Sequence, residues 1–86
     1  STKVNFLEDH VHNRTVLEMV SIDRPGLLVD ISEVLRRNNI WIESAKIATI
    51  GERAEDVFYL RNEHQDAIPL ETTKRLESEL IESLDN

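Results

Sequence analysis

The sequence predicts a single small α+β domain, a two-layer sandwich in which two helices lie on one face of a four-stranded antiparallel sheet. Three observations carry this prediction. The chain has 86 residues, which is enough for one hydrophobic core. Strand-like and helix-like segments alternate in the order ββαββα. No cysteine is present to brace the fold, so hydrophobic packing must hold it.

The chain begins with a predicted β-hairpin. Val4 and Phe6 fall on one face of a short extended segment, and the polar residues 9–14 then provide turn chemistry. Residues 15–22 form the second strand. Their apolar side chains fall on both faces, which is typical of a strand buried on two sides. We therefore expect this strand to lie inside the sheet.

The first helix follows residues 23–26, Asp-Arg-Pro-Gly, which end the strand. Pro25 suits the first turn of a helix, and Asp23 can accept hydrogen bonds from the free amides there, so we expect the helix to start at about Pro25. Asn38 and Asn39 tolerate the left-handed conformation that ends many helices. Helical spacing places four apolar residues on the buried face, namely Leu27, Ile31, Val34 and Leu35.

A second predicted hairpin covers residues 40–61. The first strand of this hairpin, 40–50, is rich in β-branched residues, but its apolar alternation changes phase part of the way along. A bulge at residues 43–45 would account for the change. Gly51 and the polar residues after it turn the chain into a strand at 55–61.

The last predicted element is a helix after Pro69. Leu76, Leu80 and Leu84, with Ile81 beside them, form its apolar stripe, and no strand follows. In the usual ferredoxin-like order the final strand pairs antiparallel with the first strand. Here the N-terminal strand takes the place of that last strand. We therefore predict a circular variant of the ferredoxin-like fold.

Composition excludes several classes of partner. The absence of cysteine favours a reducing, cytoplasmic setting. The formal net charge of -7, with ten scattered Lys and Arg residues, argues against nucleic acid. No apolar run could span a membrane and no signal peptide is evident, so we expect no membrane association. The chain opens with Ser1 and not Met, and we expect it to be a piece of a longer protein.

The turn before the first helix suits a small zwitterion. The first amides of the helix, between Pro25 and Leu28, lack intrahelical partners and favour a carboxylate, while Gly26 allows close approach to the backbone. Asp23 could pair with an ammonium group, and Asn39 could hydrogen-bond an amide. Glutamine has all three groups. The same residues are also an ordinary strand-to-helix connection, and the residue chemistry alone leaves both interpretations open.

A family resemblance favours the ligand site. Residues 20–28, Val-Ser-Ile-Asp-Arg-Pro-Gly-Leu-Leu, followed later by Asn39-Ile40, resemble the signature of the ACT domain, a family of amino-acid-binding regulatory modules. In that family such sites lie between two ACT domains, so Asn39 and Ile40 could face the turn of a partner. The resemblance implies eight ligand-binding residues: Asp23, Arg24, Pro25, Gly26, Leu27, Leu28, Asn39 and Ile40.

A second stretch, residues 45–60, resembles the C-terminal ACT region of the bifunctional enzymes that add uridylyl groups to the nitrogen regulatory protein PII and remove them. The resemblance implies a glutamine-responsive domain that controls such a parent enzyme, which is a transferase and a hydrolase. It implies no cofactor for the domain itself and magnesium for the parent. PII would be a partner only through the parent.

The sequence is also compatible with functions other than ligand binding. The domain could hold domains or subunits together without a ligand. It could be a small acylphosphatase-like hydrolase, for which only Arg24 is suggestively placed, and we name no catalytic residue. His10 and His12 lack a nearby third metal ligand, so we expect no metal site.

Trp41 and Tyr59 are expected to be packing or interface residues. The sheet face without helices would be covered either by association or by long polar side chains.

Overall fold

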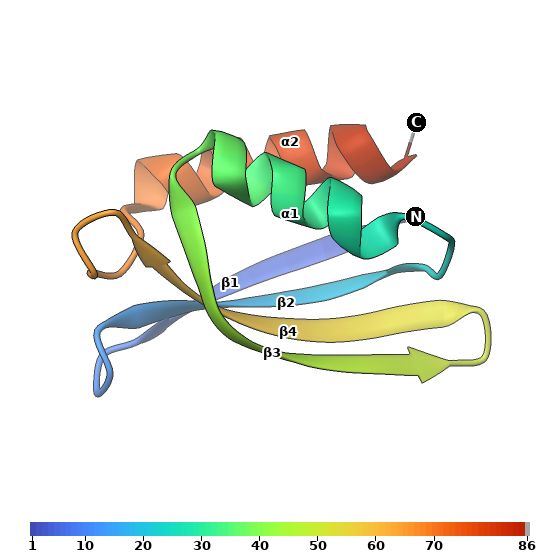
Figure 1. The fold of residues 1–86 in the computed structure, drawn as a ribbon, viewed down its shortest axis with the longest axis horizontal. Coiled ribbons are helices and arrows are strands. Elements are labelled where there is room, and N and C mark those ends of the chain that lie inside the picture. The colour runs from blue at the N-terminus through green and yellow to red at the C-terminus, as the bar shows by residue number, and fades with distance from the viewer. Residues whose placement is uncertain (86) are drawn as a thin grey trace.

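The computed structural model describes residues 1–85, and Asn86, the last residue of the predicted domain, lies outside the described residues. The helices lie side by side over one face of the sheet, as Figure 1 shows. The element order is ββαββα, as predicted: β1 (Lys3–Asp9), β2 (Arg14–Ile22), α1 (Leu27–Arg37), β3 (Ile40–Ile50), β4 (Arg53–Asn62) and α2 (Leu70–Asp85).

The sheet has the strand order β1-β2-β4-β3, with every neighbouring pair antiparallel. Strand β2 therefore lies inside the sheet, and β1 occupies the edge position beside it that the last strand of the usual order would take. The predicted circular variant of the ferredoxin-like fold is confirmed. The two edges differ in character. β1 is seven residues long and carries Lys3, Glu8 and Asp9, whereas β3 has eleven residues and more apolar side chains.

One hydrophobic core lies between the sheet and the helices. Helix α1 buries the four residues that its periodicity predicts, Leu27, Ile31, Val34 and Leu35. The expectation that β2 is buried on both faces is wrong, because helices cover only one face. On the other face, Val16 and Val20 are partly exposed and Ile22 is exposed. Leu17, Phe58, Leu60, Leu76 and Leu80 complete the centre of the core.

Helix α1 starts at Leu27, two residues later than the predicted start at Pro25. The reason is Gly26, which precedes the helix with φ 82, a left-handed conformation that no α-helical residue adopts. No side-chain cap forms at this position, so the expected capping by Asp23 does not occur. At the other end, α1 finishes at Arg37 and Asn38 is its C-cap residue, with φ -99. The predicted left-handed conformation occurs at Asn39, whose φ is 58.

The predicted bulge in β3 is present. The register of β3 against β4 shifts between Ile42 and Ser44, so Ile42 lies opposite Leu60 while Ser44 lies opposite Tyr59. This shift restores the alternation after the bulge and turns Ala45, Ile47 and Thr49 toward the helix side of the sheet. Beyond Ile40, every residue of β3 is exposed, because the strand is at the sheet edge.

The two ends of the described chain are joined directly. The hydroxyl of Thr2 donates to a carboxylate oxygen of Asp85 at 2.6 Å, and the Thr2 amide donates to the same oxygen at 3.0 Å. These bonds fix the last turn of α2 against the start of β1. None of the helices within residues 1–85 has the length and apolar character needed to cross a bilayer.

Candidate functional site

A hollow of about 220 Å³ opens where β2 leads into α1. Its walls come from three places in the chain: the turn with Asp23 and Gly26, the first turn of α1, and the facing strands β3 and β4. Five of the eight residues that the sequence predicts for the site lie around it, and Pro25 lies in the same turn. The five are Asp23, Arg24, Gly26, Leu27 and Leu28.

The start of α1 offers free backbone donors to this hollow, but at positions different from those expected. Pro25 has no N–H, and the Leu27 amide already donates to the Arg24 carbonyl at 3.2 Å. Across the part of the chain that the structure describes, the amides of Gly26, Leu28 and Val29 have no backbone acceptor. These three N–H groups can therefore bind an anion at the positive end of the helix.

Arg24 is occupied by a local ion pair. Its guanidinium donates to the Asp30 carboxylate at 2.6 Å and to the Pro25 carbonyl at 3.2 Å, so it folds back over the first turn of α1. In this arrangement Arg24 stabilises the turn at the wall of the hollow. The positive charge beside the hollow is thus largely neutralised by Asp30, and the backbone amides remain as the donors.

Asp56 is a residue of this hollow that the sequence interpretation missed. It lies on β4 between Ala54 and Phe58, on the face of the sheet that carries the helices, and it is only 2% exposed. Burial raises the pKa of the Asp56 carboxyl. A hydrogen bond from the Ala48 amide lowers this pKa in part, whereas the negative charge of Asp23 raises it further. A signal was present in the sequence, because Asp56 has the parity of core residues in an otherwise apolar strand.

Asn39 and Ile40 lie at the opposite end of α1. The helix has 11 residues, so at a rise of about 1.5 Å per residue this end is roughly 16 Å from its start. A second hollow of about 520 Å³ lies here, lined by Asn39, Ile40 and Trp41 among others. Asn39 is exposed, whereas the side chain of Ile40 belongs to the core. The fold therefore does not bring these two residues to the first hollow of the same chain.

Both hollows belong to one seam between α1 and the edge strand β3. The first is lined by the start of α1 with Ile47 and Thr49, and the second by the end of α1 with residues 40–42. Exposed apolar side chains follow the seam along its whole length: Leu28, Val29, Trp41, Ile42 and Ile47. We name these five residues the seam residues. Exposed apolar side chains beside an unpaired strand edge are typical of an association surface.

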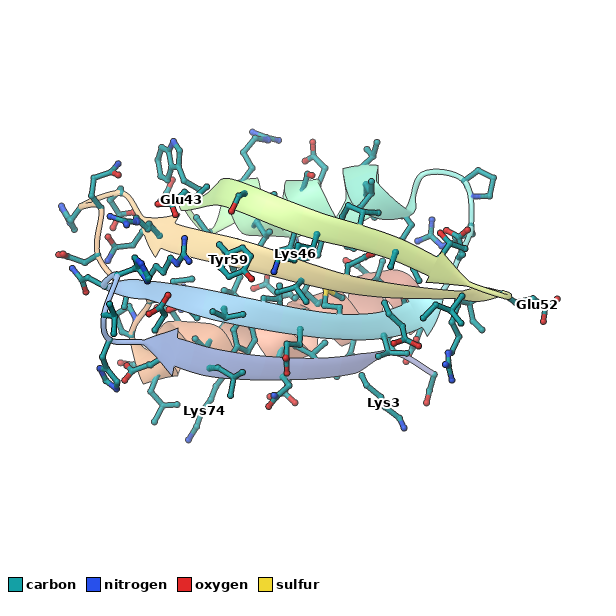
Figure 2. All side chains as sticks on the ribbon, turned by 90° about the horizontal axis from the view of Figure 1, so that it is seen from below. Lys3, Glu43, Lys46, Glu52, Tyr59 and Lys74 are labelled. Carbon is teal, nitrogen blue, oxygen red and sulfur yellow. The ribbon has the colours of Figure 1, made fainter. Side chains whose placement is uncertain are left out.

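The sheet face without helices carries a polar network at one end. Figure 2 shows Tyr59 and Lys46 on this face. The Arg14 guanidinium lies 4.4 Å from the centre of the Tyr59 ring, and Lys46 lies 5.8 Å from it on the same ring. Glu43, at the bulge, forms ion pairs with both Arg14 and Arg61. These contacts tie β3 to β2 and β4, and we assign them a structural role.

The histidines make only local contacts with acids. His12 lies 2.9 Å from Asp9, and His10 lies 3.1 Å from Glu8, both in or beside the first hairpin turn. Within residues 1–85, no group of three or more histidine, aspartate or glutamate side chains is arranged to hold a metal ion.

The family model of the ACT domain matches residues 15–78 of this chain. Among solved structures, a protein of unknown function from Galdieria sulphuraria has a similar fold, with a TM-score of 0.65 and 20% identity. The likeness covers 98% of this chain and 40% of that one.

Curated relatives are similar over nearly the whole chain. Proteins named bifunctional uridylyltransferase/uridylyl-removing enzyme are 39% identical in Idiomarina loihiensis, over 99% of this chain, and 44% identical in Legionella pneumophila, over 93% of it. The relative from Photobacterium profundum is 41% identical over 93% of this chain. This chain spans about a tenth of the length of these relatives, 9 to 10%.

Proposed function

We propose that this chain, which belongs to the ACT domain family, is a regulatory domain that binds a small amino acid, and that glutamine is the ligand. The observation that carries the proposal is the hollow at the start of α1. There, three residues with unpaired amides, Gly26, Leu28 and Val29, line the same small space as Asp23 and Asp56. These groups are complementary to a carboxylate and an ammonium on one carbon.

The site becomes complete when two domains pair. A two-fold axis through β3 would place the edge strands of two copies antiparallel, as in β-strand addition. The start of α1 in one copy would then meet the end of α1 in the other. Asn39 of one domain would face the Asp23 turn of its neighbour and could hydrogen-bond the side-chain amide of glutamine. This explains why the predicted residues fall at both ends of one seam.

The relatives suggest what the domain controls. Since the proteins it resembles along 93–99% of its length are named uridylyltransferase/uridylyl-removing enzymes, we propose that it serves a cytoplasmic enzyme of this kind in nitrogen metabolism. Glutamine would favour one arrangement of paired ACT domains and so shift the parent between transferring uridylyl groups to PII and removing them. The domain would need no cofactor, whereas the parent would use magnesium.

A second candidate function is a ligand-free interaction or dimerisation module. The exposed seam residues favour it, because they would drive pairing without any ligand. The two candidates share the interface and differ only in whether the hollows are occupied. Measuring binding separates them.

Calorimetric titration of the 86-residue chain with L-glutamine, with the other amino acids as controls, tests the proposal. Saturable heat that is specific for glutamine, with one ligand per chain, is the expected result. Heat with another amino acid and not with glutamine would reassign the ligand. No heat with any amino acid at millimolar concentration, together with self-association in sedimentation, would establish the ligand-free module instead.

A further inference from the structure

Asp56 is a buried carboxylate without a counter-charge. Its single hydrogen bond comes from the Ala48 amide, and at 3.3 Å this bond is long. Among the described residues, no lysine, arginine or histidine forms an ion pair with it, although seven Arg–carboxylate ion pairs are present. A buried carboxylate in this state is unfavourable, because lost hydration is not replaced by a partner.

A second polar group nearby is also without a partner. Ser21 lies opposite Ala54, the next residue of β4 on the same face as Asp56, and it is 4% exposed. Its hydroxyl oxygen is buried and makes no hydrogen bond within the described part of the chain. Most buried hydroxyl groups are paired in folded proteins. Ser21 lies diagonal to Asp56 across β2 and β4 and does not line the hollow, so it marks a second incompletely paired buried group in this part of the sheet and not a ligand contact.

The hollow at the start of α1 gives Asp56 an approach from outside. Asp56 forms part of its wall, together with Ala54 and the residues that follow Gly26. The unpaired amides of α1 border the same space. A ligand in this hollow would therefore be bordered by the residues with free amides and by Asp56, while Asp23 is exposed at the turn.

We propose that Asp56 receives the α-ammonium group of the ligand, and that it restricts the site to amino acids whose amino group is free. The inference rests on the proposed amino-acid site and assigns the ammonium to Asp56 in place of Asp23, whose exposed carboxylate adds only a screened attraction. An ammonium group supplies three donors and a positive charge, which are what the buried carboxylate lacks. Acetylation of the amino group removes the positive charge and leaves one neutral N–H donor in place of three charged ones.

The test compares Asp56→Asn with a matched control, Glu55→Gln. Glu55 is the neighbouring residue on β4, points to the opposite face and pairs with Arg53. Calorimetry uses L-glutamine and the other amino acids, with N-acetyl-L-glutamine as the blocked probe. We expect Asp56→Asn to weaken binding about ten- to a hundredfold, as loss of a charge-assisted hydrogen bond does, Glu55→Gln to bind like wild type, and the blocked probe not to bind.

Each other outcome has a definite meaning. Equal binding by wild type and Asp56→Asn, or binding of the blocked probe, overturns the role of Asp56 and leaves the proposed function standing. A wild type that binds no amino acid overturns both. Urea unfolding without ligand gives an independent measure: Asp56→Asn should unfold at the same or a higher urea concentration than wild type. A lower midpoint would make Asp56 a structural residue and overturn the inference.

Discussion

The side-chain amide of Asn38 donates a hydrogen bond to Glu79 at 3.0 Å, so the residue that ends α1 is held by α2. Arg37 donates to the same carboxylate oxygen at 3.1 Å, and Arg75 of α2 donates to the side-chain amide oxygen Oδ1 of Asn38 at 3.0 Å. This cluster fixes the end of α1, and with it the position of Asn39 at the second hollow.

Glu79→Gln should destabilise the domain at neutral pH by about 1 kcal/mol, the typical value of a hydrogen bond. The hydrogen bond from Asn38 lowers the pKa of Glu79, and the interaction with Arg37 lowers it further. Burial raises this pKa, but by less than the two partners lower it. An acid whose pKa is lowered by folding stabilises the fold above its unfolded pKa and loses that contribution as pH falls through the folded value. Urea unfolding at pH 7 and at pH 3 should therefore show the difference only at pH 7. Glu77→Gln, an exposed change on the same helix, is the control, and an equal loss in both variants would contradict the prediction.

The pH dependence of Asp56 should have the opposite sign. Because burial raises the pKa of its carboxyl, the folded state takes up a proton more readily than the unfolded state, and wild type gains stability relative to Asp56→Asn as pH falls. Urea midpoints of the two proteins, measured from pH 7 down to pH 4, should converge. A constant difference across this range would show that the carboxyl titrates normally.

Gly26→Ala and Gly51→Ala form a matched pair. Both glycines have positive φ, 82 and 63, and an added Cβ has room at each, since its nearest neighbour would be Arg24 at 3.8 Å for the first and nothing within 4 Å for the second. Each change should cost about 1 kcal/mol through backbone strain alone. Only Gly26→Ala should also weaken glutamine binding, because it disturbs the amides at the start of α1. Equal binding by both variants would place the ligand elsewhere.

Ile47→Lys should abolish self-association without unfolding the domain. Ile47 is 51% exposed and lines the first hollow of the seam, so in a pair the charge of the introduced lysine would be buried against the partner strand. Val11→Lys, in the hairpin turn where the side chain is 88% exposed, is the control. Sedimentation equilibrium should report a monomer for the first variant and an unchanged mass for the second. A paired Ile47→Lys would show that another surface is used.

Mixing two binding-deficient variants tests whether the site is shared. In the two-fold arrangement, Asp56→Asn and Asn39→Gly damage opposite halves of each site, and glycine keeps the left-handed conformation of Asn39, whose φ is 58. Random pairing of equal amounts makes half of the dimers mixed, and each of these has one intact site. Calorimetry should thus recover about a quarter of the wild-type sites. No recovery would mean that each site lies within one chain.

The fold was predictable because its elements have strong periodic signals. The four buried residues of α1 follow helical spacing, and the bulge at Glu43 is visible as a change of phase in an alternating strand. The boundaries were less predictable. Pro25 suits a first helical turn, but the adjacent Gly26 adopts a left-handed conformation, and this delays the helix to Leu27.

The site was only half visible in the sequence. The turn of residues 23–28 is a local motif, so its position beside a hollow follows from its own residues. Asp56 was not predicted, because Val57, Phe58 and Tyr59 place apolar side chains on both faces of β4. The signal in the sequence was the parity that Asp56 shares with Phe58, which the structure shows to be a core residue. The predicted helix already placed Asn39 at the far end from the turn, and the structure adds that a second hollow lies there.

The contrast between the two edge strands limits how far the domain can polymerise. Strand β3 would pair with β3 of a second copy about a two-fold axis. This contact buries the β3 edge of both copies, so the assembly is closed as a dimer. The remaining edge, β1, carries Lys3, Glu8 and Asp9, charges that make a strand edge a poor template for another chain. The charges on β1 thus prevent the dimers from adding further chains at that edge, and apolar replacements at these positions would allow filaments to form.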